Sequence, residues 1–357
     1  MLSGRWFPET KARLERLIAQ HAGPGRLAVF DFDNTILCRD VGDTTLAYLA
    51  TEGWLDPEWL AALSPPFGLL DAEIRLDDGA LVYYEALQQA TAHVPDEHTA
   101  PASGYVWAVQ VLAGLTLDTL LHATRQGLHL AEQGGPAAPY PLPFVYPEMA
   151  DLLGMLRRHE VDLRIVSATN VWSARWMVQQ FLNPVLQRLH GPGAVVAPHE
   201  VLGMGLLLQD QESGGLYRDA HLVHLDPAYA HLDPEALARY RLTPHLDHPL
   251  PTFTGKVAAL LQHVGPEPPL LAAGDSLNDL AVLRHATHRL WIARLDDPAL
   301  QVAAAPLADD AWLLQPVLTG PAPGFLDRRD AIPERQRTGT VASALRPWLR
   351  RGRLLDF

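Results

Sequence analysis

The stretch VFDFDNTILC, Val29 to Cys38, decides how the rest of the chain is interpreted. An apolar run, RLAVF at residues 26–30, predicts a short buried strand, and Asp31 and Asp33 follow directly behind it. Burying a carboxylate is costly unless a cation or hydrogen-bond donors compensate its charge. The stretch therefore predicts a site for a metal ion, a phosphate group or both at the end of this strand.

The composition is that of an acidic chain large enough for a sizeable core. It has 357 residues, of which 48% are hydrophobic, and a formal net charge of -13. These values predict one large domain or two of ordinary size, and the charge argues against a nucleic-acid partner. Cys38 is the single cysteine, so no internal disulfide can form, and we expect a structural thiol. No apolar run has the length of a signal-peptide core or a transmembrane helix, so we expect a cytoplasmic protein without a membrane partner.

Apolar runs that predict strands alternate with amphipathic segments that predict helices. Three further strands are expected, at 161–168 (VDLRIVSA), 268–276 (PPLLAAGDS) and 288–293 (HRLWIA). The expected helices include 8–21, 147–159, 172–189 and 256–264. This alternation predicts an α/β fold, a Rossmann-like parallel sheet with helices on both faces. Ligands of such sheets bind beyond the carboxyl ends of the strands.

The first two expected strands are too far apart for an ordinary crossover connection. We expect a helical cap domain at 40–133, inserted into a discontinuous core of residues 1–39 and 134–320. A basic C-terminal extension, 321–357, is expected to end in a helix packed on the core. A second excursion, 195–251, contains GLLLQDQESGGLYRD, which predicts a hairpin with Ser-Gly-Gly at its turn.

Polar residues follow the first three expected strands at their carboxyl ends. Asp31, Asp33 and Thr35 follow the first, Ser167 ends the second, and GDSLND, residues 274–279, ends the third. A further signal is composition, because only two of the 28 lysine and arginine residues are lysines, Lys11 and Lys256. A compact ammonium suits a point contact with phosphate and carboxylate better than a planar guanidinium does. Lys256 is therefore a candidate site residue.

This ordered set resembles the four motifs of the haloacid dehalogenase superfamily. DxDxT matches Asp31 to Thr35, a serine matches Ser167, a lone lysine matches Lys256, and GDxxxD matches residues 274–279. The cap at 40–133 stands where that superfamily carries its helical cap. The resemblance implies a phosphatase, because the second aspartate of the first motif marks the phosphatases of the superfamily.

The resemblance also implies roles for these residues. Asp31 would be a nucleophile that forms an aspartyl-phosphate, and Asp33 would protonate the leaving alcohol and then activate water. Ser167 and Lys256 would stabilise charge on the phosphoryl oxygens. The implied Mg²⁺ ligands are Asp31, Asp33 through its carbonyl, Asp275 and Asp279. The implied phosphate-binding residues are Ser167, Ala168, Lys256 and Asn278.

Within the superfamily, FDFDNTILCRDVGDTTLAYLATEGWL looks most like the phosphorylcholine phosphatase group. Asp43 matches a position where that group carries glutamate, and Glu85 matches a cap carboxylate. A quaternary ammonium is bound by aromatic faces and a nearby carboxylate. The candidate faces are Tyr83, Tyr84, Trp107 and Trp54, although each aromatic taken alone is more often part of a cap core. The implied substrate is a small, cationic phosphate ester.

Other functions remain open at this point. Phosphoserine would need a carboxylate for its amine, such as Asp40, and an arginine for its carboxyl group, such as Arg39, Arg75 or Arg125. Histidinol phosphate is a third candidate substrate. A regulatory module that binds phosphate or Mg²⁺ without turnover is a different class altogether, and intact Asp33 and Lys256 argue against it. The sequence does not predict an oligomeric state.

Overall fold

The computed structural model describes most of the chain. The described residues are 1–63, 76–91, 103–135, 138–297, 300–301, 311–320 and 322–328. Arg75 and the basic tail, two subjects of the sequence-based predictions, lie outside them.

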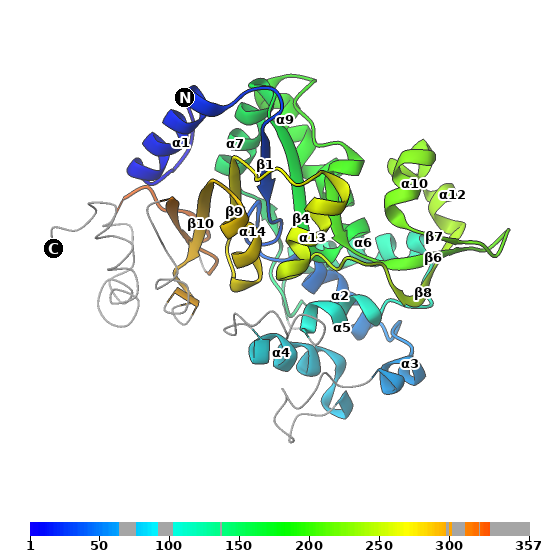
Figure 1. The fold of residues 1–357 in the computed structure, drawn as a ribbon. Coiled ribbons are helices and arrows are strands. Elements are labelled where there is room, and N and C mark those ends of the chain that lie inside the picture. The colour runs from blue at the N-terminus through cyan, green and yellow to red at the C-terminus, as the bar shows by residue number, and fades with distance from the viewer. Residues whose placement is uncertain are drawn as a thin grey trace.

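A seven-stranded sheet in the order β12-β11-β10-β9-β1-β4-β5 forms the centre of the molecule (Figure 1). The strands are β1 (Leu27–Phe30), β4 (Asp162–Asn170), β5 (Val201–Met204), β9 (Leu271–Gly274), β10 (His288–Arg294), β11 (Trp312–Leu318) and β12 (Gly324–Phe325). All neighbours pair in parallel except β11 and β12. The predicted α/β class with a parallel sheet is confirmed, and β12 carries the sheet into the segment predicted as an extension.

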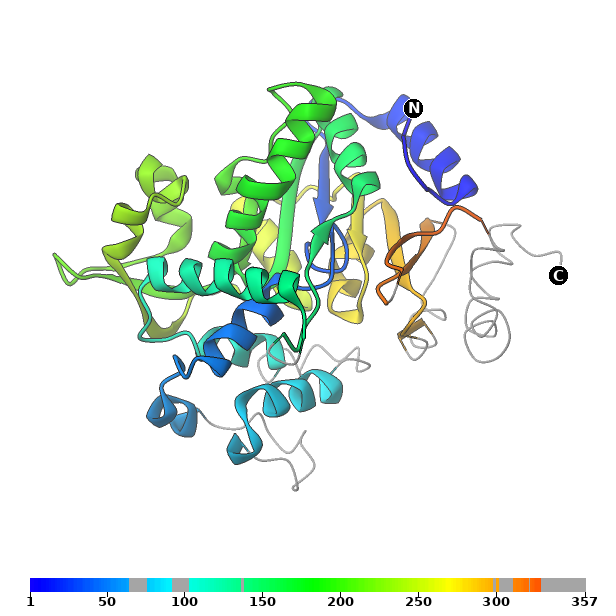
Figure 2. The ribbon, with the colours of Figure 1, turned by 180° about the vertical axis from the view of Figure 1, so that it is seen from behind.

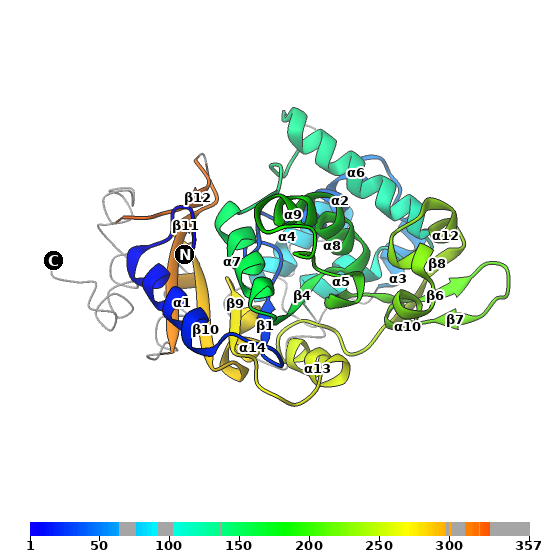
Figure 3. The ribbon, with the colours of Figure 1, turned by 90° about the horizontal axis from the view of Figure 1, so that it is seen from above.

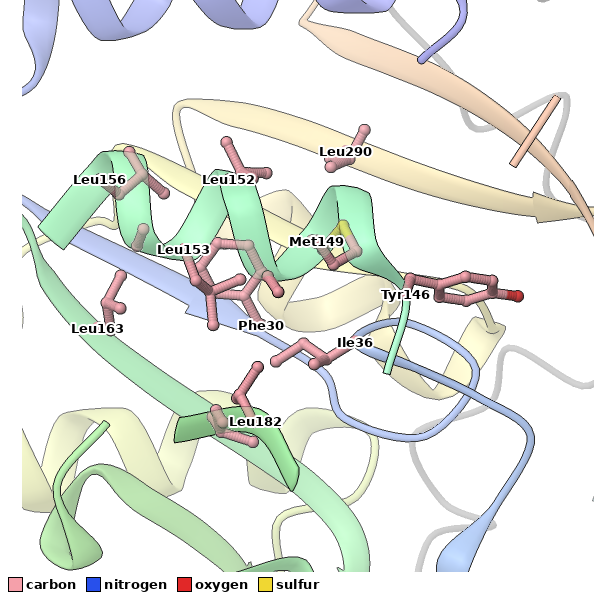
Figure 4. Close-up of a cluster of buried hydrophobic side chains, with 14 of the residues drawn as sticks. Phe30, Ile36, Tyr146, Met149, Leu152, Leu153, Leu156, Leu163, Leu182 and Leu290 are labelled. Carbon is pink, nitrogen blue, oxygen red and sulfur yellow. The ribbon is translucent and has the colours of Figure 1, made fainter. Parts of the chain in front are cut away.

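Both faces of this sheet are covered, because successive side chains of a strand point to opposite sides. Ala28 and Phe30 join one buried cluster, to which α1 (Pro8–His21), α7 (Pro147–Arg158) and α9 (Asn183–His190) contribute. Figure 4 shows Phe30 of this cluster with Met149, Leu152, Leu153 and Leu156 of α7. Val29 joins the opposite cluster, with α13 (Thr254–His263) and α14 (Leu280–His285). Figure 3 shows α7 and α9 on one side of the sheet and α13 on the other.

The helix expected at 172–189 is interrupted. It consists of α8 (Val171–Met177), a π-turn η3 (Val178–Leu182) and α9. Pro184 lies at the start of α9 and has no backbone N–H, so the regular bonding pattern cannot continue through it. The N–H of Asn183 instead donates to the carbonyl of Val178, five residues back.

The insertion between β1 and β4 is helical and lies at the carboxyl ends of the strands (Figures 1 and 2). Its described helices are α2 (Val41–Thr51), α3 (Pro57–Ala62), η1 (Leu76–Asp78), α4 (Ala80–Thr91), α5 (Gly104–Gln110) and α6 (Leu117–Gln133). The chain enters and leaves it through two antiparallel strands, β2 (Leu37–Cys38) and β3 (Phe144–Val145). The Cys38 thiol is fully buried there, which fits a structural role.

The second excursion forms a three-stranded sheet in the order β7-β6-β8. Its elements are η4 (Pro198–Glu200), β6 (Leu206–Asp210), β7 (Leu216–Tyr217), α10 (Asp219–Leu225), α11 (Pro227–Ala230), α12 (Pro234–Ala238) and β8 (Tyr240–Leu246). The antiparallel pairing of β6 with β7 confirms the expected hairpin. Backbone bonds join Leu242 of β8 to Gly114 and Leu115 of the insertion, at 2.9 and 2.8 Å. The two excursions share one hydrophobic cluster, which the sequence did not reveal.

Candidate active site

The strand ends that carry the motif residues meet at one edge of the sheet. β1 lies between β4 and β9, so Asp31 follows the middle one of these three strands. Ser167 of β4 lies on one side of it, and Asp275, which follows β9, lies on the other. The N–H of Asp31 donates to the carbonyl of Ala273 at 2.9 Å and continues the β1–β9 ladder by one residue. Sheet pairing thus brings together residues that are more than 240 positions apart in the chain.

Lys256 is the central cation of the site. It lies in the first turn of α13, is fully buried, and donates from Nζ to Asp31 Oδ1 and Asp279 Oδ1, both at 2.6 Å. The other carboxylate oxygen of Asp279 accepts from the N–H of Asp275 and from the N–H and hydroxyl of Ser276. The lysine is therefore held between the first and fourth motifs, and Asp279 fixes the turn that follows β9 (η5, Leu277–Asp279).

Asp275 lies beside this pair. Thr35 donates to its Oδ1 at 3.3 Å, and Arg294 Nε lies 2.9 Å from its Oδ2. Oxygen atoms of Asp31, Asp275 and Asp279 all lie within 4.8 Å of one another. Three buried carboxylates are compensated by two cations, Lys256 and Arg294, which leaves one negative charge unbalanced. The cluster fits a hard divalent cation, which takes oxygen ligands.

Asp33 has a separate environment formed by β4 and the cap. Its Oδ1 accepts from the N–H of Val41, the first residue of α2, at 2.8 Å. Its Oδ2 accepts from the hydroxyls of Thr169 at 2.7 Å and Ser167 at 3.3 Å. Asp31 and Asp33 thus follow the same strand but have different partners.

The charge states of these groups reflect burial. Desolvation raises the pKa of both Asp31 and Asp33 well above the ordinary range of a carboxyl group. It also raises the pKa of Asp275, to about 6, although the charge of Arg294 opposes this. Burial alone would lower the pKa of Lys256, but the charges of Asp279 and Asp31 outweigh it and raise that pKa. Lys256 is therefore cationic at neutral pH, while the carboxyl groups hold protons more readily than usual.

A cavity of about 300 Å³ lies over this edge of the sheet. Its core wall includes Asp31, Asp33, Ser167, Ala168, Asp275 and Asn278. Its cap wall includes Asp40, Asp43, Gln88, Gln89 and Tyr105. Lys256 and Asp279 do not line it, because they lie fully buried behind the core wall. The cavity therefore lies between the carboxyl groups that follow the strands on one side and the inserted helices on the other.

Asp43 is the proposed cap residue that the structure places on the cavity. Tyr84 donates its hydroxyl to Asp43 Oδ1 at 2.7 Å, and Gln88 Nε2 donates to the Tyr84 oxygen at 2.9 Å. Burial, followed by the charge of Asp40, raises the pKa of Asp43 well above the ordinary range. The cap wall therefore carries two neighbouring carboxylates, Asp40 and Asp43.

The other aromatic candidates do not line this cavity. Tyr83 and Trp107 are almost fully buried, with ring centroids 5.4 Å apart, and Tyr84 stacks on Trp107 at 6.3 Å. These three rings belong to the hydrophobic cluster of the cap. Aromatic residues at helical spacing lie on one face of a helix, and that face packs against the core of the cap. Trp54 stacks on His122 at a partly exposed position. Their prediction as faces for a cation is not supported by this geometry.

Two further predicted residues are engaged elsewhere. Glu85 is exposed, accepts a hydrogen bond from Tyr140 at 3.0 Å and does not line the cavity, although its charge contributes to the raised pKa of Asp43. Asn278 lines the cavity, but its Oδ1 accepts from Thr252 Oγ1 at 2.7 Å and from the N–H of Phe253 at 2.6 Å. It therefore braces the turn that begins α13 and carries Lys256.

Arg39 and Arg125, the two described arginines considered for a phosphoserine carboxyl group, are also absent from the cavity lining. Arg39 donates to the carbonyls of Leu142 at 2.9 Å and Thr319 at 3.4 Å, and Arg125 is exposed on α6. Among the described residues, the guanidinium that lines the cavity is that of Arg294, at the end of β10.

Sequence reasoning missed Arg294 and Tyr105. Arg294 had a usable signal, because it ends a predicted strand of the same parallel sheet and therefore had to lie at the ligand edge. Tyr105 had none, because its position depends on how α5 packs against β4. Burial raises the pKa of Tyr105 well above the ordinary range, so its phenol remains protonated.

Comparisons with known proteins agree with this architecture. A phosphorylcholine phosphatase from Pseudomonas aeruginosa is 25% identical over 283 residues, which are 76% of this chain and 74% of the relative. A solved structure of a conserved protein of unknown function from Anaerococcus prevotii aligns with a TM-score of 0.58 at 16% identity, over 92% of this chain and 97% of that one, and shares the fold. A substrate-bound phosphoserine phosphatase aligns with a TM-score of only 0.35 at 10% identity, over 75% and 85% of the chains. No family model matches the chain.

Three observations support a phosphatase of the haloacid dehalogenase superfamily. They are the parallel sheet, the four motifs that meet at its carboxyl edge, and the similarity to the phosphorylcholine phosphatase. Within that class, the relative that aligns over three quarters of the chain is named for phosphorylcholine. No described helix is long and apolar enough to cross a membrane.

Proposed function

We propose that this phosphatase hydrolyses a small, cationic phosphate monoester through an aspartyl-phosphate on Asp31, with Mg²⁺ as cofactor. The observation that carries the proposal is the position of Asp31 at the floor of the cavity, bonded to Lys256 and grouped with Asp275 and Asp279. No other described cluster of potential metal ligands has this geometry. The proposed partners are a small-molecule ester and the metal, with no nucleic acid and no membrane.

The first step is attack by a carboxylate oxygen of Asp31 on phosphorus. The P–O bond to the alcohol breaks, and Asp33 gives its proton to the leaving oxygen. The raised pKa of Asp33 favours this, because the residue holds a proton that an ordinary carboxyl group would have lost. Ser167 and Lys256 stabilise negative charge on the phosphoryl group and on Asp31.

The second step releases phosphate. Water attacks the aspartyl-phosphate while Asp33, now ionised, takes its proton, and the products are inorganic phosphate and free Asp31. The hydrogen bonds from Val41 and Thr169 hold the Asp33 carboxylate in one orientation for both steps, while the Ser167 hydroxyl, 3.3 Å from Asp33 Oδ2, donates instead to the phosphoryl group. Because Val41 opens the first cap helix, the position of this acid–base group is tied to the cap.

Asp31, Asp275 and Asp279, with the Asp33 carbonyl, are the residues that would hold Mg²⁺. The ion would supply neutralisation of the phosphate charge. The unbalanced negative charge of the buried cluster is the structural reason to expect it.

The substrate proposal rests on the cap wall of the cavity. Asp40 and Asp43 place two buried carboxyl groups there, whose raised pKa values a bound cation would lower by stabilising their ionised forms, and Tyr105 provides an aromatic ring beside them. A quaternary ammonium is attracted by carboxylates and ring faces, and each cation–π contact contributes about 0.5–2 kcal/mol. Phosphorylcholine, which names the relative from Pseudomonas aeruginosa, fits this wall.

Arg294 favours a second candidate, phosphoserine. Its guanidinium lines the same cavity and can pair with a substrate carboxylate, while Asp40 or Asp43 accepts the amine. Against this, Arg294 already lies 2.9 Å from Asp275, so a substrate carboxylate would have to share it. We therefore place phosphoserine second.

The test is kcat/KM with Mg²⁺ for phosphorylcholine, phosphoserine and a neutral alkyl phosphate of similar size. We expect phosphorylcholine to exceed the neutral ester by about 10- to 100-fold, from one or two cation contacts. Equal rates on the two would refute recognition of the cation, and a lead for phosphoserine that Arg294→Gln abolishes would favour the second candidate. Turnover of none of the three would contradict a small-ester phosphatase.

A further inference from the structure

A second cavity, of about 220 Å³, lies outside the catalytic site. Strand β5 forms one wall, α10 another, and α13 with the loop before it a third. The polar side chains that matter for the argument are Arg164, His199, Arg218, His224, Asp247 and His263. None of these residues lines the catalytic cavity.

The backbone wall of this cavity is a sheet edge. Among the described strands, β5 pairs only with β4, and its residues Val201, Leu202 and Gly203 line the cavity. Edge strands present polar backbone groups that have no partner within the sheet. A polar ligand therefore finds backbone groups here in addition to side chains.

The charges around the cavity do not cancel. Arg218 Nε pairs with Asp247 at 2.6 Å, which removes one charge of each sign. Arg164 and Arg157 both pair with Glu200, at 3.4 and 2.5 Å, so two guanidinium groups share one carboxylate.

The remaining carboxylate on the wall is already neutralised. Asp219 accepts both guanidinium bonds of the fully buried Arg175, at 3.0 and 2.7 Å. One positive charge is left in excess around the cavity, which favours an anionic ligand.

Three imidazoles add to this preference. The rings of His199 and His224 lie 5.2 Å apart between centroids, and His263 reaches the same cavity from the end of α13. Histidines can donate hydrogen bonds to an anion and can gain a proton when one binds. With Arg164 and Arg218 they surround the cavity from four elements.

We propose that this cavity is a second ligand site, which binds a small dianion such as inorganic phosphate or a short dicarboxylate. The guanidinium and imidazole N–H groups can donate hydrogen bonds to the oxygen atoms of such ions. The volume lies below that of pockets for drug-sized ligands, about 300–1,000 Å³, and accommodates a small ion. A bound dianion bridges β5, α10 and α13.

The site is connected to the catalytic centre by one helix. α13 carries Lys256 in its first turn and His263 at its last residue, and Pro249 and Pro251 of the preceding loop line the cavity. The next residue, Thr252, donates to Asn278 on the catalytic side. Occupancy of the cavity therefore restrains the segment that positions Lys256.

The experiment is calorimetric titration of the full chain with succinate, followed by competition with inorganic phosphate. We expect one saturable succinate site, displaced by phosphate, and a Kd raised at least fivefold in a His199→Gln/His224→Gln variant. The matched control is His21→Gln/His288→Gln, another neighbouring histidine pair, with centroids 6.3 Å apart and outside the cavity, which should leave the Kd unchanged. Arg294→Gln should also leave it unchanged, because that residue lines the catalytic cavity.

Any of three results overturns the proposal: succinate does not bind saturably, phosphate does not compete with it, or the His199→Gln/His224→Gln and Arg294→Gln variants weaken succinate binding equally. Should the cavity variant fail to fold, NMR of the wild-type chain with labelled histidine gives the answer directly. The ring signals of His199, His224 and His263 should shift together with succinate. If they do not move at saturating succinate, the assignment of the site is wrong.

Discussion

The two walls of the catalytic cavity are built differently. On the core wall, carboxylates follow parallel strands and are held by Lys256, Arg294 and backbone donors across the sheet. On the cap wall, Asp43 depends on one phenol, Tyr84, whose ring packs in the cap core. The carboxylates of the core wall are thus placed by strand pairing, whereas the cap wall is placed by helix packing, and the two meet at Asp33, which accepts from the N–H of Val41.

The largest effect is expected at the nucleophile. Asp31→Asn should lower kcat by at least about three orders of magnitude, because an amide cannot form the acyl-phosphate. Steady-state kinetics on an aryl phosphate measure this without involving cap selectivity. Asp162→Asn, an exposed aspartate at the start of β4, is the control and should keep full activity. Near-normal turnover by a folded Asp31→Asn protein would exclude the aspartyl-phosphate mechanism.

Lys256→Arg should follow, with a loss of about 100-fold or more despite the conserved charge. The ammonium is fully buried between two carboxylate oxygens at 2.6 Å, and a planar guanidinium is too large for that space. Lys11→Arg changes the chain's other lysine, outside the site, and should be silent. If Lys256→Arg retains most activity, the reaction does not require a compact ammonium group between Asp31 and Asp279.

The metal prediction concerns the same wall. A chelator should abolish activity and Mg²⁺ should restore it. Asp275→Asn should raise the apparent dissociation constant for Mg²⁺ by about 10- to 100-fold. Titration of activity with Mg²⁺ at saturating substrate gives that constant. Full activity after exhaustive chelation would contradict the assignment of the carboxylate cluster.

The cap wall should show a smaller and selective effect. Asp43→Asn should reduce kcat/KM for a cationic ester by about 5- to 50-fold while that for a neutral ester changes little, because only the charge facing the ammonium is lost. Glu85→Gln is the matched control, since Glu85 is exposed and bonded to Tyr140 rather than to the cavity. An equal loss on both esters would mean that Asp43 supports the fold instead of recognising the substrate.

The smallest effect concerns the stability of the metal-free chain. Burial raises the pKa of Asp275 from 3.8 to about 6, so the folded chain holds a proton there that the unfolded chain has already lost. The contribution of this group to the free energy of unfolding is therefore complete below pH 3.8 and declines as the pH rises through about 6. Thermal melts of the metal-free wild type and Asp275→Asn should agree most closely at pH 4, where Asp275 is neutral like asparagine, and the wild type should melt a few degrees below the variant at pH 7. A pH-independent difference would contradict the raised pKa.

The sequence was informative wherever a residue's position follows from strand order. Asp31, Ser167 and Asp275 each follow an apolar run, and parallel strands bring their carboxyl ends to one edge, so the sequence alone predicts that these side chains lie close together. The scarcity of lysine singled out Lys256 in the same way. Arg294 followed from the same rule and was overlooked.

Three features depended on packing between elements that are distant in the chain. Helical periodicity indicates that Tyr83 and Trp107 are apolar-face residues, but only the contact between α4 and α5 shows that they face each other rather than the cavity. Tyr105 reaches the cavity because of where α5 rests against the sheet. The second excursion joins the cap through backbone bonds between Leu242 and residues 114–115 that no local pattern encodes.

The sequence by itself thus determined four of the seven strands of the sheet, the polar residues at their carboxyl ends and the class of reaction, because these depend on short-range periodicity and on charges that must be compensated when buried. The tertiary structure alone decided which cap side chains touch a ligand, and it created the second cavity beside β5. Both are surfaces formed between helices and loops whose relative placement is set by side-chain packing, which one sequence does not specify through any local rule.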